Sequence, residues 1–191
     1  MTSVTVIGTG NMGQAISSVV SKGGSTVELI GKDDKDKQAS GDIVVLAVPY
    51  VAVADVIAER RDQLAGKVVV DITNPLDFET FDSLTVPADS SAAAEIAAAL
   101  PQSRVLKAFN TTFAGTLSAG TVGPLTTTVL VAGEDSDAKS LLAGVITAGG
   151  LQVIDAGSLK RARELEAMGF LEINLAAGEK IPWTGGFGIV H

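Results

Sequence analysis

The stretch Val4–Gly13, VTVIGTGNMG, decides how the chain is organised. Its β-branched first half predicts a strand covered on both faces, because such side chains fit a pleated, buried surface. Gly8, Gly10 and Gly13 then follow at the spacing G-x-G-x-x-G. In that pattern the first glycine permits a tight turn, the second lets a pyrophosphate approach the backbone, and the third lets helix and strand pack closely.

An apolar helix face follows the glycines. Met12, Ile16, Val19 and Val20 recur at three- and four-residue steps, which predicts a helix with one buried face. The loop then directs the free N–H groups and the positive end of that helix at an anion. Glycines at this spacing also occur in purely structural turns, but here a strand precedes them and a second β-branched run lies at 27–30. We therefore expect a dinucleotide phosphate at this loop.

Composition excludes several function classes. The 191 residues are 46% hydrophobic with a net charge of −8, which suits one domain with a sizeable core. No apolar run reaches the roughly 18 residues of a membrane span, and the negative charge disfavours nucleic acid and anionic membranes as partners. The chain has no cysteine for a disulfide or thiolate metal site and begins with a strand rather than a signal peptide. We expect a cytoplasmic protein without a bound metal.

The inventory of side chains also bears on mechanism. The only histidine is His191, the last residue, and chain ends are usually frayed. Dehydrogenases that oxidise alcohols generally need a group to take the hydroxyl proton. Without a usable histidine, this chain either uses a lysine or carboxylate for that purpose or performs a reaction that needs no proton acceptor. We favour a reaction without a side-chain acid or base and expect no catalytic residue.

The tip of the second strand selects the dinucleotide, because the adenosine ribose lies against it. Asp33 stands 20 residues after Gly13, the distance at which a carboxylate accepts from the free ribose 2′-OH of NAD. Lys32, Lys35 and Lys37 offer charges for the 2′-phosphate of NADP instead. A solvated loop of mixed charge fits the same residues.

Two buried strands end in proline, and ligands in open α/β sheets bind outside the carboxyl ends of strands. The strand at 42–50 brings Val48, Pro49 and Tyr50 to the crevice, where Tyr50 either covers a ring or lies in an interface. The strand at 67–76 brings Asn74, which either bonds the nicotinamide ribose or only begins a turn.

A third strand, predicted at 104–112, ends in a polar cluster that includes Asn110 and could meet a substrate. Lys107 in the same strand either serves the site or snorkels from a sheet edge. Between these strands, a helix at 51–64 presents Glu59, Arg60 and Arg61 to solvent, and a second helix begins at Ser90 or Ser91 and ends near Pro101.

The last third of the chain predicts a strand at 126–132, a helix at 136–148, a strand at 151–155 and a terminal helix at 159–177. In the terminal helix, one apolar stripe is formed by Leu165, Met168, Leu171 and Leu175, while Phe170 and Ile173 point elsewhere. A helix that is apolar on more than one side is buried on more than one side. We therefore expect a homodimer, with residues 158–191 at its interface.

Six motifs together resemble the coenzyme F420-dependent NADP oxidoreductases and, similarly, the cytosolic NADPH domain of six-transmembrane metalloreductases. They are IGTGNMG, DIVVLAVPY, VVDITNPL, SSAAAEIAAALPQSRVLKAFNTT, VAGEDSDAK and LQVIDAGSLKRARELE, and they cover nearly the whole chain. The resemblance implies an NADP(H) site with a flavin-like acceptor stacked beside the nicotinamide. With Asn110 added, the expected cofactor-binding residues are Gly8, Thr9, Gly10, Asn11, Met12, Gly31, Lys32, Asp33, Ala47, Val48, Pro49, Tyr50, Asn74, Pro75 and Asn110.

At the second-strand tip the chain departs from the family, which usually reads Gly-Ser-Arg where Gly31, Lys32 and Asp33 stand here. A carboxylate thus replaces a phosphate-binding arginine. We expect NADPH to be preferred over NADH, since the resemblance outweighs one aspartate.

The sequence thus predicts an α/β protein, Rossmann-type, with a mostly parallel doubly wound sheet and a C-terminal helix, in a single domain over residues 1–191. We expect an oxidoreductase that passes hydride directly between nicotinamide and a deazaflavin, coenzyme F420, or a flavin. One alternative is an imine or hydroxyacid reductase, although those enzymes usually add a helical substrate domain and only 36 residues follow Asp155. Another alternative is a redox sensor that binds NADP(H) without turnover.

Overall fold

The computed structural model describes residues 1–190 and contains a seven-stranded sheet in the order β2-β1-β3-β4-β5-β8-β9. His191 lies outside the described residues. In chain order the elements are β1 (Ser3–Ile7), α1 (Asn11–Lys22), β2 (Thr26–Ile30), β3 (Ile43–Leu46), α2 (Tyr50–Leu64), β4 (Val68–Asp71), α3 (Ala92–Ala99), β5 (Arg104–Lys107), α4 (Ala114–Ala119), β6 (Thr121–Val122), β7 (Leu125–Thr126), β8 (Thr128–Gly133), α5 (Ser136–Ala148), β9 (Gln152–Gly157), the short 3₁₀ helix η1 (Leu159–Arg161) and α6 (Ala162–Ala177).

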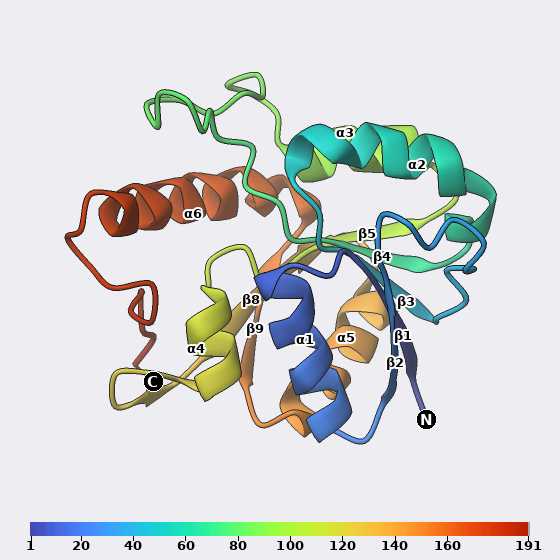
Figure 1. Cartoon of the computed structure of the whole chain (residues 1–191), viewed down its shortest axis with the longest axis horizontal. Coiled ribbons are helices and arrows are strands. Elements are labelled where there is room, and N and C mark those ends of the chain that lie inside the picture. The colour runs from blue at the N-terminus through green and yellow to red at the C-terminus, as the bar shows by residue number, and fades with distance from the viewer. Residues whose placement is uncertain (191) are drawn as a thin grey trace.

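The first five strands of the sheet run parallel. Val6 of β1, for example, lies opposite Leu29 of β2 and Val45 of β3. β8 is antiparallel to β5, and β9 is parallel to β8. Continuous Val- and Ile-rich strands such as these are stable when helices cover both faces of the sheet, which Figure 1 shows. The predicted Rossmann-type, mostly parallel α/β fold with a C-terminal helix is confirmed.

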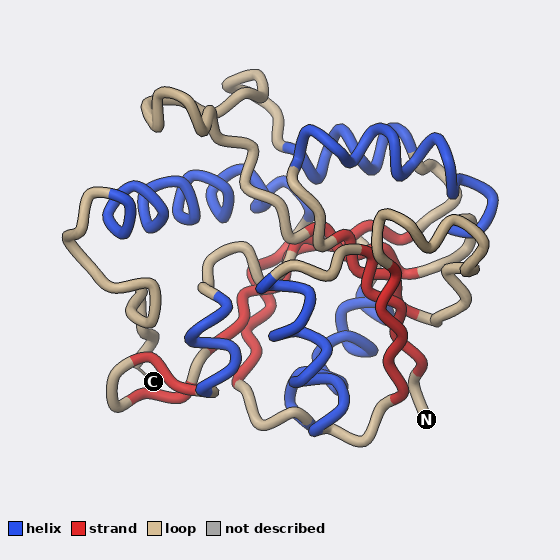
Figure 2. Tube along the Cα trace, in the orientation of Figure 1, coloured by secondary structure: helices blue, strands red, loops and turns tan. Residues whose placement is uncertain are grey.

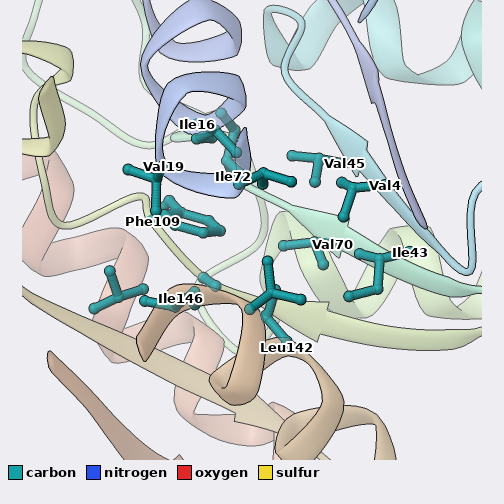
Figure 3. Packing of buried hydrophobic residues seen from close by; sticks show 14 of the residues in the cluster. Val4, Ile16, Val19, Ile43, Val45, Val70, Ile72, Phe109, Leu142 and Ile146 are labelled. Atoms are coloured by element: carbon teal, nitrogen blue, oxygen red, sulfur yellow. The ribbon is translucent and has the colours of Figure 1, made fainter. Parts of the chain in front are cut away.

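Two apolar layers flank the sheet because successive strand residues point to opposite faces. Within β3, Val45 faces the layer that α1 and α5 cover, where Ile16 and Ile146 are buried; Figure 3 shows this packing. Val44 faces the other layer, under α2 and α3, together with Ile57. Helices therefore cover both faces of the sheet.

Several strands are shorter than predicted. β3 ends at Leu46 rather than at position 50, and β5 ends at Lys107 rather than at position 112. Beyond β3, residues 47–50 line the crevice, and beyond β5, Asn110 and Thr112 line it, while Ala47 and Ala108 each still donate a backbone hydrogen bond to a neighbouring strand. The sequence reading missed α4 and the β6–β7 hairpin, because a six-residue helix and two-residue strands are too short to show a periodicity. By contrast, α5 has the predicted bounds, since Asp135 caps it and Gly149 ends it.

Arg60 was expected in solvent, and that prediction is wrong. Its side chain is buried, and its guanidinium donates to the carbonyls of Lys37 at 2.6 Å and Asp34 at 3.1 Å. Arg60 therefore fastens the polar loop at 31–41 to α2.

The buried face of α6 also differs from the predicted apolar stripe. Its buried residues are Ala162, Leu165, Glu166, Gly169, Glu172 and Ala176, whereas Leu171 is 52% exposed. The two glutamates find hydrogen-bond partners elsewhere in the fold and so occupy the face that the leucines were expected to fill. Neither α6 nor any other helix within residues 1–190 is long and apolar enough to cross a membrane.

The segment that follows α6, residues 178–190, returns toward α4 and the β6–β7 hairpin (Figure 2). A Cβ atom added to Gly188 would lie 2.6 Å from the side chain of Leu125 in β7, and one added to Gly115 of α4 would lie 2.9 Å from the carbonyl of Trp183. The C-terminal segment thus packs closely on these two elements.

Candidate functional site

Two adjoining hollows lie where the amino end of α1 meets the carboxyl ends of the central strands. One has a volume of about 540 Å³ and the other of about 720 Å³. Their shared wall consists of Asn11, Met12, Ile72, Asn74 and Ile173. A crevice at this place in an open α/β sheet is where ligands bind.

The three glycines of the loop have different surroundings. A Cβ on Gly8 would lie 2.1 Å from the carbonyl oxygen of Ala47, and Gly8 also has φ +119°. A Cβ on Gly13 would lie 2.1 Å from the carbonyl oxygen of Gly8. A Cβ on Gly10, however, would meet nothing within 4 Å. Gly8 and Gly13 are thus required by packing, whereas Gly10 leaves open space beside the crevice.

The amino end of α1 suits an anion. Gly10 is its N-cap, no side chain caps it, and its first turn contains no acidic residue. Asn11 and Met12 open the helix and line both hollows. The free N–H groups and the helix dipole therefore face the crevice without a competing carboxylate of their own turn.

Asp34 shapes the tip of β2, and the sequence reading did not single it out. Its carboxylate accepts from the Gly31 N–H at 2.8 Å and pairs with Lys37 at 3.2 Å. The Gly31 N–H, followed by Lys37, lowers the pKa of Asp34 below its usual value. Lys32 and Asp33 are exposed beside this turn, so the contacts predicted for them to the adenosine ribose or its phosphate stay predictions.

Residues 47–50 line the smaller hollow together with Gly10, Thr73 and Phe78. Tyr50 begins α2, and its hydroxyl donates to the carboxylate of Glu95. Burial, and then Glu95, raise the pKa of Tyr50, so this phenol stays protonated at neutral pH.

Asn74 and Asn110 form a reciprocal pair across the ends of β4 and β5. Asn74 Nδ2 donates to the carbonyl of Asn110 at 2.9 Å, and Asn110 Nδ2 donates to Asn74 Oδ1 at 2.9 Å and to the carbonyl of Leu165 at 2.8 Å. Within the described residues, Asn110 Oδ1 and Thr73 Oγ1 are buried without a hydrogen-bond partner. Because unpaired buried oxygens are costly, these two suit a ligand's donors.

The crevice gathers nine of the expected residues: Gly10, Asn11, Met12, Ala47, Val48, Pro49, Tyr50, Asn74 and Asn110. The other six do not line either hollow: Gly8 and Thr9 lie in the turn before α1, Gly31, Lys32 and Asp33 lie at the β2 tip, and Pro75 is buried.

The larger hollow has walls that the sequence reading missed. They come from α4 and the C-terminal segment and include Phe113, Gly115, Ser118, Trp183 and Thr184. The rings of Phe113 and Trp183 lie 4.9 Å apart at 58°. The one signal in the sequence was the single tryptophan in a glycine-rich tail.

A buried ion network supports the floor of the crevice. Lys107 Nζ contacts Asp71 at 2.7 Å, Glu166 at 2.8 Å and the carbonyl of Thr73 at 2.6 Å, with all three charged side chains fully buried. Glu166 also accepts from the N–H of Ala92 at the start of α3. Because β5 pairs with strands on both sides, the alternative in which Lys107 snorkels from a sheet edge is wrong.

The chain and its fold are similar to known proteins. The family model described as "NADP oxidoreductase coenzyme F420-dependent" matches residues 27–75. The rat metalloreductase STEAP3 is 34% identical over 126 residues, which is 66% of this chain and 24% of that protein. A crystal structure of a candidate F420-dependent NADP reductase from Arthrobacter sp. FB24 superposes with a TM-score of 0.87 at 25% identity, over 100% of both chains.

The F420-dependent NADP reductase of Methanocaldococcus jannaschii is 31% identical over 171 residues, which cover 87% of this chain and 76% of that enzyme. The chain is an NADP-dependent oxidoreductase and belongs to the F420-dependent NADP reductase family.

Proposed function

We propose that this enzyme transfers hydride directly between the nicotinamide of NADP(H) and coenzyme F420, a deazaflavin, with a flavin as the alternative acceptor. The observation that carries the proposal is the pair of adjoining hollows with a shared wall. Two flat rings bound in them would contact the same five residues and so lie close to one another. Relatives named as F420-dependent NADP reductases support this choice of acceptor.

The smaller hollow and the glycine loop fit the dinucleotide. We assign the phosphates to the amino end of α1 beside Gly10, where a Cβ would have open space. The nicotinamide then lies along 47–50, near the unpaired hydroxyl oxygen of Thr73. The adenosine ribose falls to the β2 tip, at Gly31, Lys32 and Asp33.

The larger hollow fits a flat, amphipathic ring. Its apolar lining includes Ile72, Phe113 and Ile173, and its polar lining includes Gln14 and Asn110. Aromatic and aliphatic walls favour a ring by stacking and burial. A few amide groups at the edge then fix its orientation.

The residues of the site bind and orient but transfer no proton. The nicotinamide, when bound, supplies or accepts the hydride. The Tyr50 hydroxyl is committed to Glu95, and the Lys107 ammonium is committed to two carboxylates beneath the crevice. What the chain contributes is alignment of two rings and exclusion of water, which are the protein's usual contributions to hydride transfer.

A labelled cofactor tests the proposal. NADPH carrying deuterium at the transferred position is mixed with F420, FMN or FAD, and the product is analysed by mass spectrometry. Deuterium in the reduced deazaflavin is the expected result. The proposal would be overturned if the enzyme reduced a cyclic imine or a keto acid faster than any of these three acceptors.

We further propose that the chain works as a single domain in a cytoplasmic homodimer. Leu171 on the outer side of α6 and Phe78 beside the crevice are 52% and 59% exposed, and pairing of two copies would cover such side chains. Size-exclusion chromatography coupled to light scattering measures the molar mass of the wild type and of Leu171→Glu, in which we expect the dimer to be weakened. An unchanged molar mass for that variant would place the interface elsewhere.

A further inference from the structure

The C-terminal segment closes one side of the larger hollow. Trp183 and Thr184 both line that cavity, and the Trp183 ring packs at a tilt against Phe113 at the start of α4. The position of this segment therefore decides whether the cavity has its outer wall.

Glu172 lies beneath the same segment. It is 1% exposed on the inner face of α6, and its Oε1 accepts the N–H of Phe187 at 3.2 Å. A Cβ added to Gly186 would lie 2.5 Å from this oxygen, so the backbone of the segment presses directly on the carboxyl group.

The surroundings of Glu172 contain no opposite charge within the described part of the chain. The void beside it is about 10 Å³ and is lined by Thr111, Thr112 and Thr116 near α4, Thr127 and Thr128 at β8, Val122 of β6, and residues 185–187. Threonine hydroxyls do not titrate near neutral pH. A void of that size admits no more than about one water molecule, so an ionised carboxylate there is poorly solvated.

We propose that Glu172 is a positioning residue whose neutral form holds residues 181–190 in place, so that Trp183 forms the outer wall of the acceptor cavity. Ionisation of Glu172 releases the segment and opens the cavity. The part of this inference that concerns the acceptor rests on the proposed function, whereas the docking of the segment does not.

The direction of the pH effect follows from comparing the pKa of Glu172 when the segment is docked with its pKa when the segment is released. Burial raises the pKa of Glu172 from its usual 4.5 to about 7, against the smaller lowering effect of the Phe187 N–H. Once the segment leaves, water reaches the carboxyl group and its pKa returns toward the usual value. Docking is therefore at full strength below pH 4.5, weakens as pH rises to about 7, and is constant above that. The total weakening of the docking equilibrium is about 10²- to 10³-fold.

Trp183 reports on this directly, because it is the only tryptophan. Its emission is recorded from pH 5 to pH 9 in the free enzyme, without cofactor or acceptor. We expect a red shift with a midpoint between about pH 5 and pH 7 in the wild type. Glu172→Gln keeps an acceptor oxygen and stays neutral, so its emission should match the low-pH wild type throughout.

Glu164→Gln is the matched control, since Glu164 is an exposed glutamate on the same helix, 56% exposed and paired with Arg161. It should show the wild-type transition. A wild type without a transition, or a Glu172→Gln variant that retains it, would overturn the inference. Circular dichroism of each variant verifies that the fold is intact.

The link between the segment and the acceptor cavity is tested by measuring steady-state kinetics with F420 at pH 6 and at pH 8.5. The apparent KM for F420 should rise by up to about tenfold between these two pH values in the wild type and remain flat in Glu172→Gln, with little change in kcat. Equal pH dependence of KM in both proteins would refute the link to the acceptor. If F420 is not turned over at all, the proposed function fails, while the fluorescence result still decides the docking of the segment.

Discussion

Replacing Gly10 by valine separates binding from folding in this enzyme. Gly10 has φ −70° and ψ −176°, an extended backbone that valine adopts without strain, and its Cβ would meet nothing within 4 Å. We therefore expect the free energy of unfolding to change by less than about 0.5 kcal/mol. The branched side chain would occupy the space in which the pyrophosphate approaches the loop.

The expected loss of affinity can be worked from the contacts that the valine displaces. Hydrogen bonds from backbone N–H groups to a charged phosphate contribute about 1.5–3 kcal/mol each. Losing two of them costs at least about 3 kcal/mol, or a roughly hundredfold higher Kd for NADPH. Gly10→Ala, with a smaller side chain, should fall between the wild type and valine.

Calorimetric titration with NADPH and thermal unfolding should be measured on the same preparations. Gly144→Ala is the matched control, because Gly144 lies in α5 with nothing within 4 Å of its added Cβ, so binding should be unchanged and stability slightly increased. Gly13→Ala should lose stability as well as affinity, since its Cβ would lie 2.1 Å from the Gly8 carbonyl oxygen. Undiminished NADPH affinity in Gly10→Val would remove the glycine loop from the cofactor site.

Three further predictions concern the rest of the site. Lys107→Met should destabilise the fold by about 3–5 kcal/mol in denaturant unfolding, because it leaves two buried carboxylates unpaired; a change below about 1 kcal/mol would show that the ion network is dispensable. Lys32→Ala should weaken NADPH binding but not NADH binding, and Asp33→Arg should widen the preference for NADPH; tighter NADH binding by the wild type would refute this assignment. Tyr50→Phe and Asn110→Ala should slow single-turnover hydride transfer at saturation by less than about tenfold; a loss above about a thousandfold would indicate a proton-transfer role.

Local sequence patterns sufficed for the parts of the fold that local chemistry specifies. The glycine spacing after β1 predicted the turn, the start of α1 and the side of the sheet where the crevice lies. Asp135 and Gly149 delimited α5, since a cap and a stop signal are read from neighbouring residues. Each of these features depends on residues within a few positions of one another.

Charged residues with distant partners could not be placed from periodicity. Lys107 meets Asp71 and Glu166, which are 36 and 59 residues away in the chain. Glu172 faces a segment that begins only after α6 has ended. A helical pattern places such glutamates on the solvent side by default, so the sequence assigned the wrong face of α6 to the core. The outer wall of the larger hollow was missed for the same reason, because Trp183 reaches Phe113 across 70 residues of chain.

The anchoring of the β2 tip bears on how readily coenzyme preference can change. Arg60 holds the loop at 31–41 through the main-chain carbonyls of Lys37 and Asp34 rather than through side chains. Lys32 and Asp33 are exposed and take no part in that attachment. Their identities are therefore free to change while the loop keeps its shape. Under the proposed assignment of the adenosine ribose to these residues, a switch between the two nicotinamide coenzymes needs only a few substitutions and costs little stability.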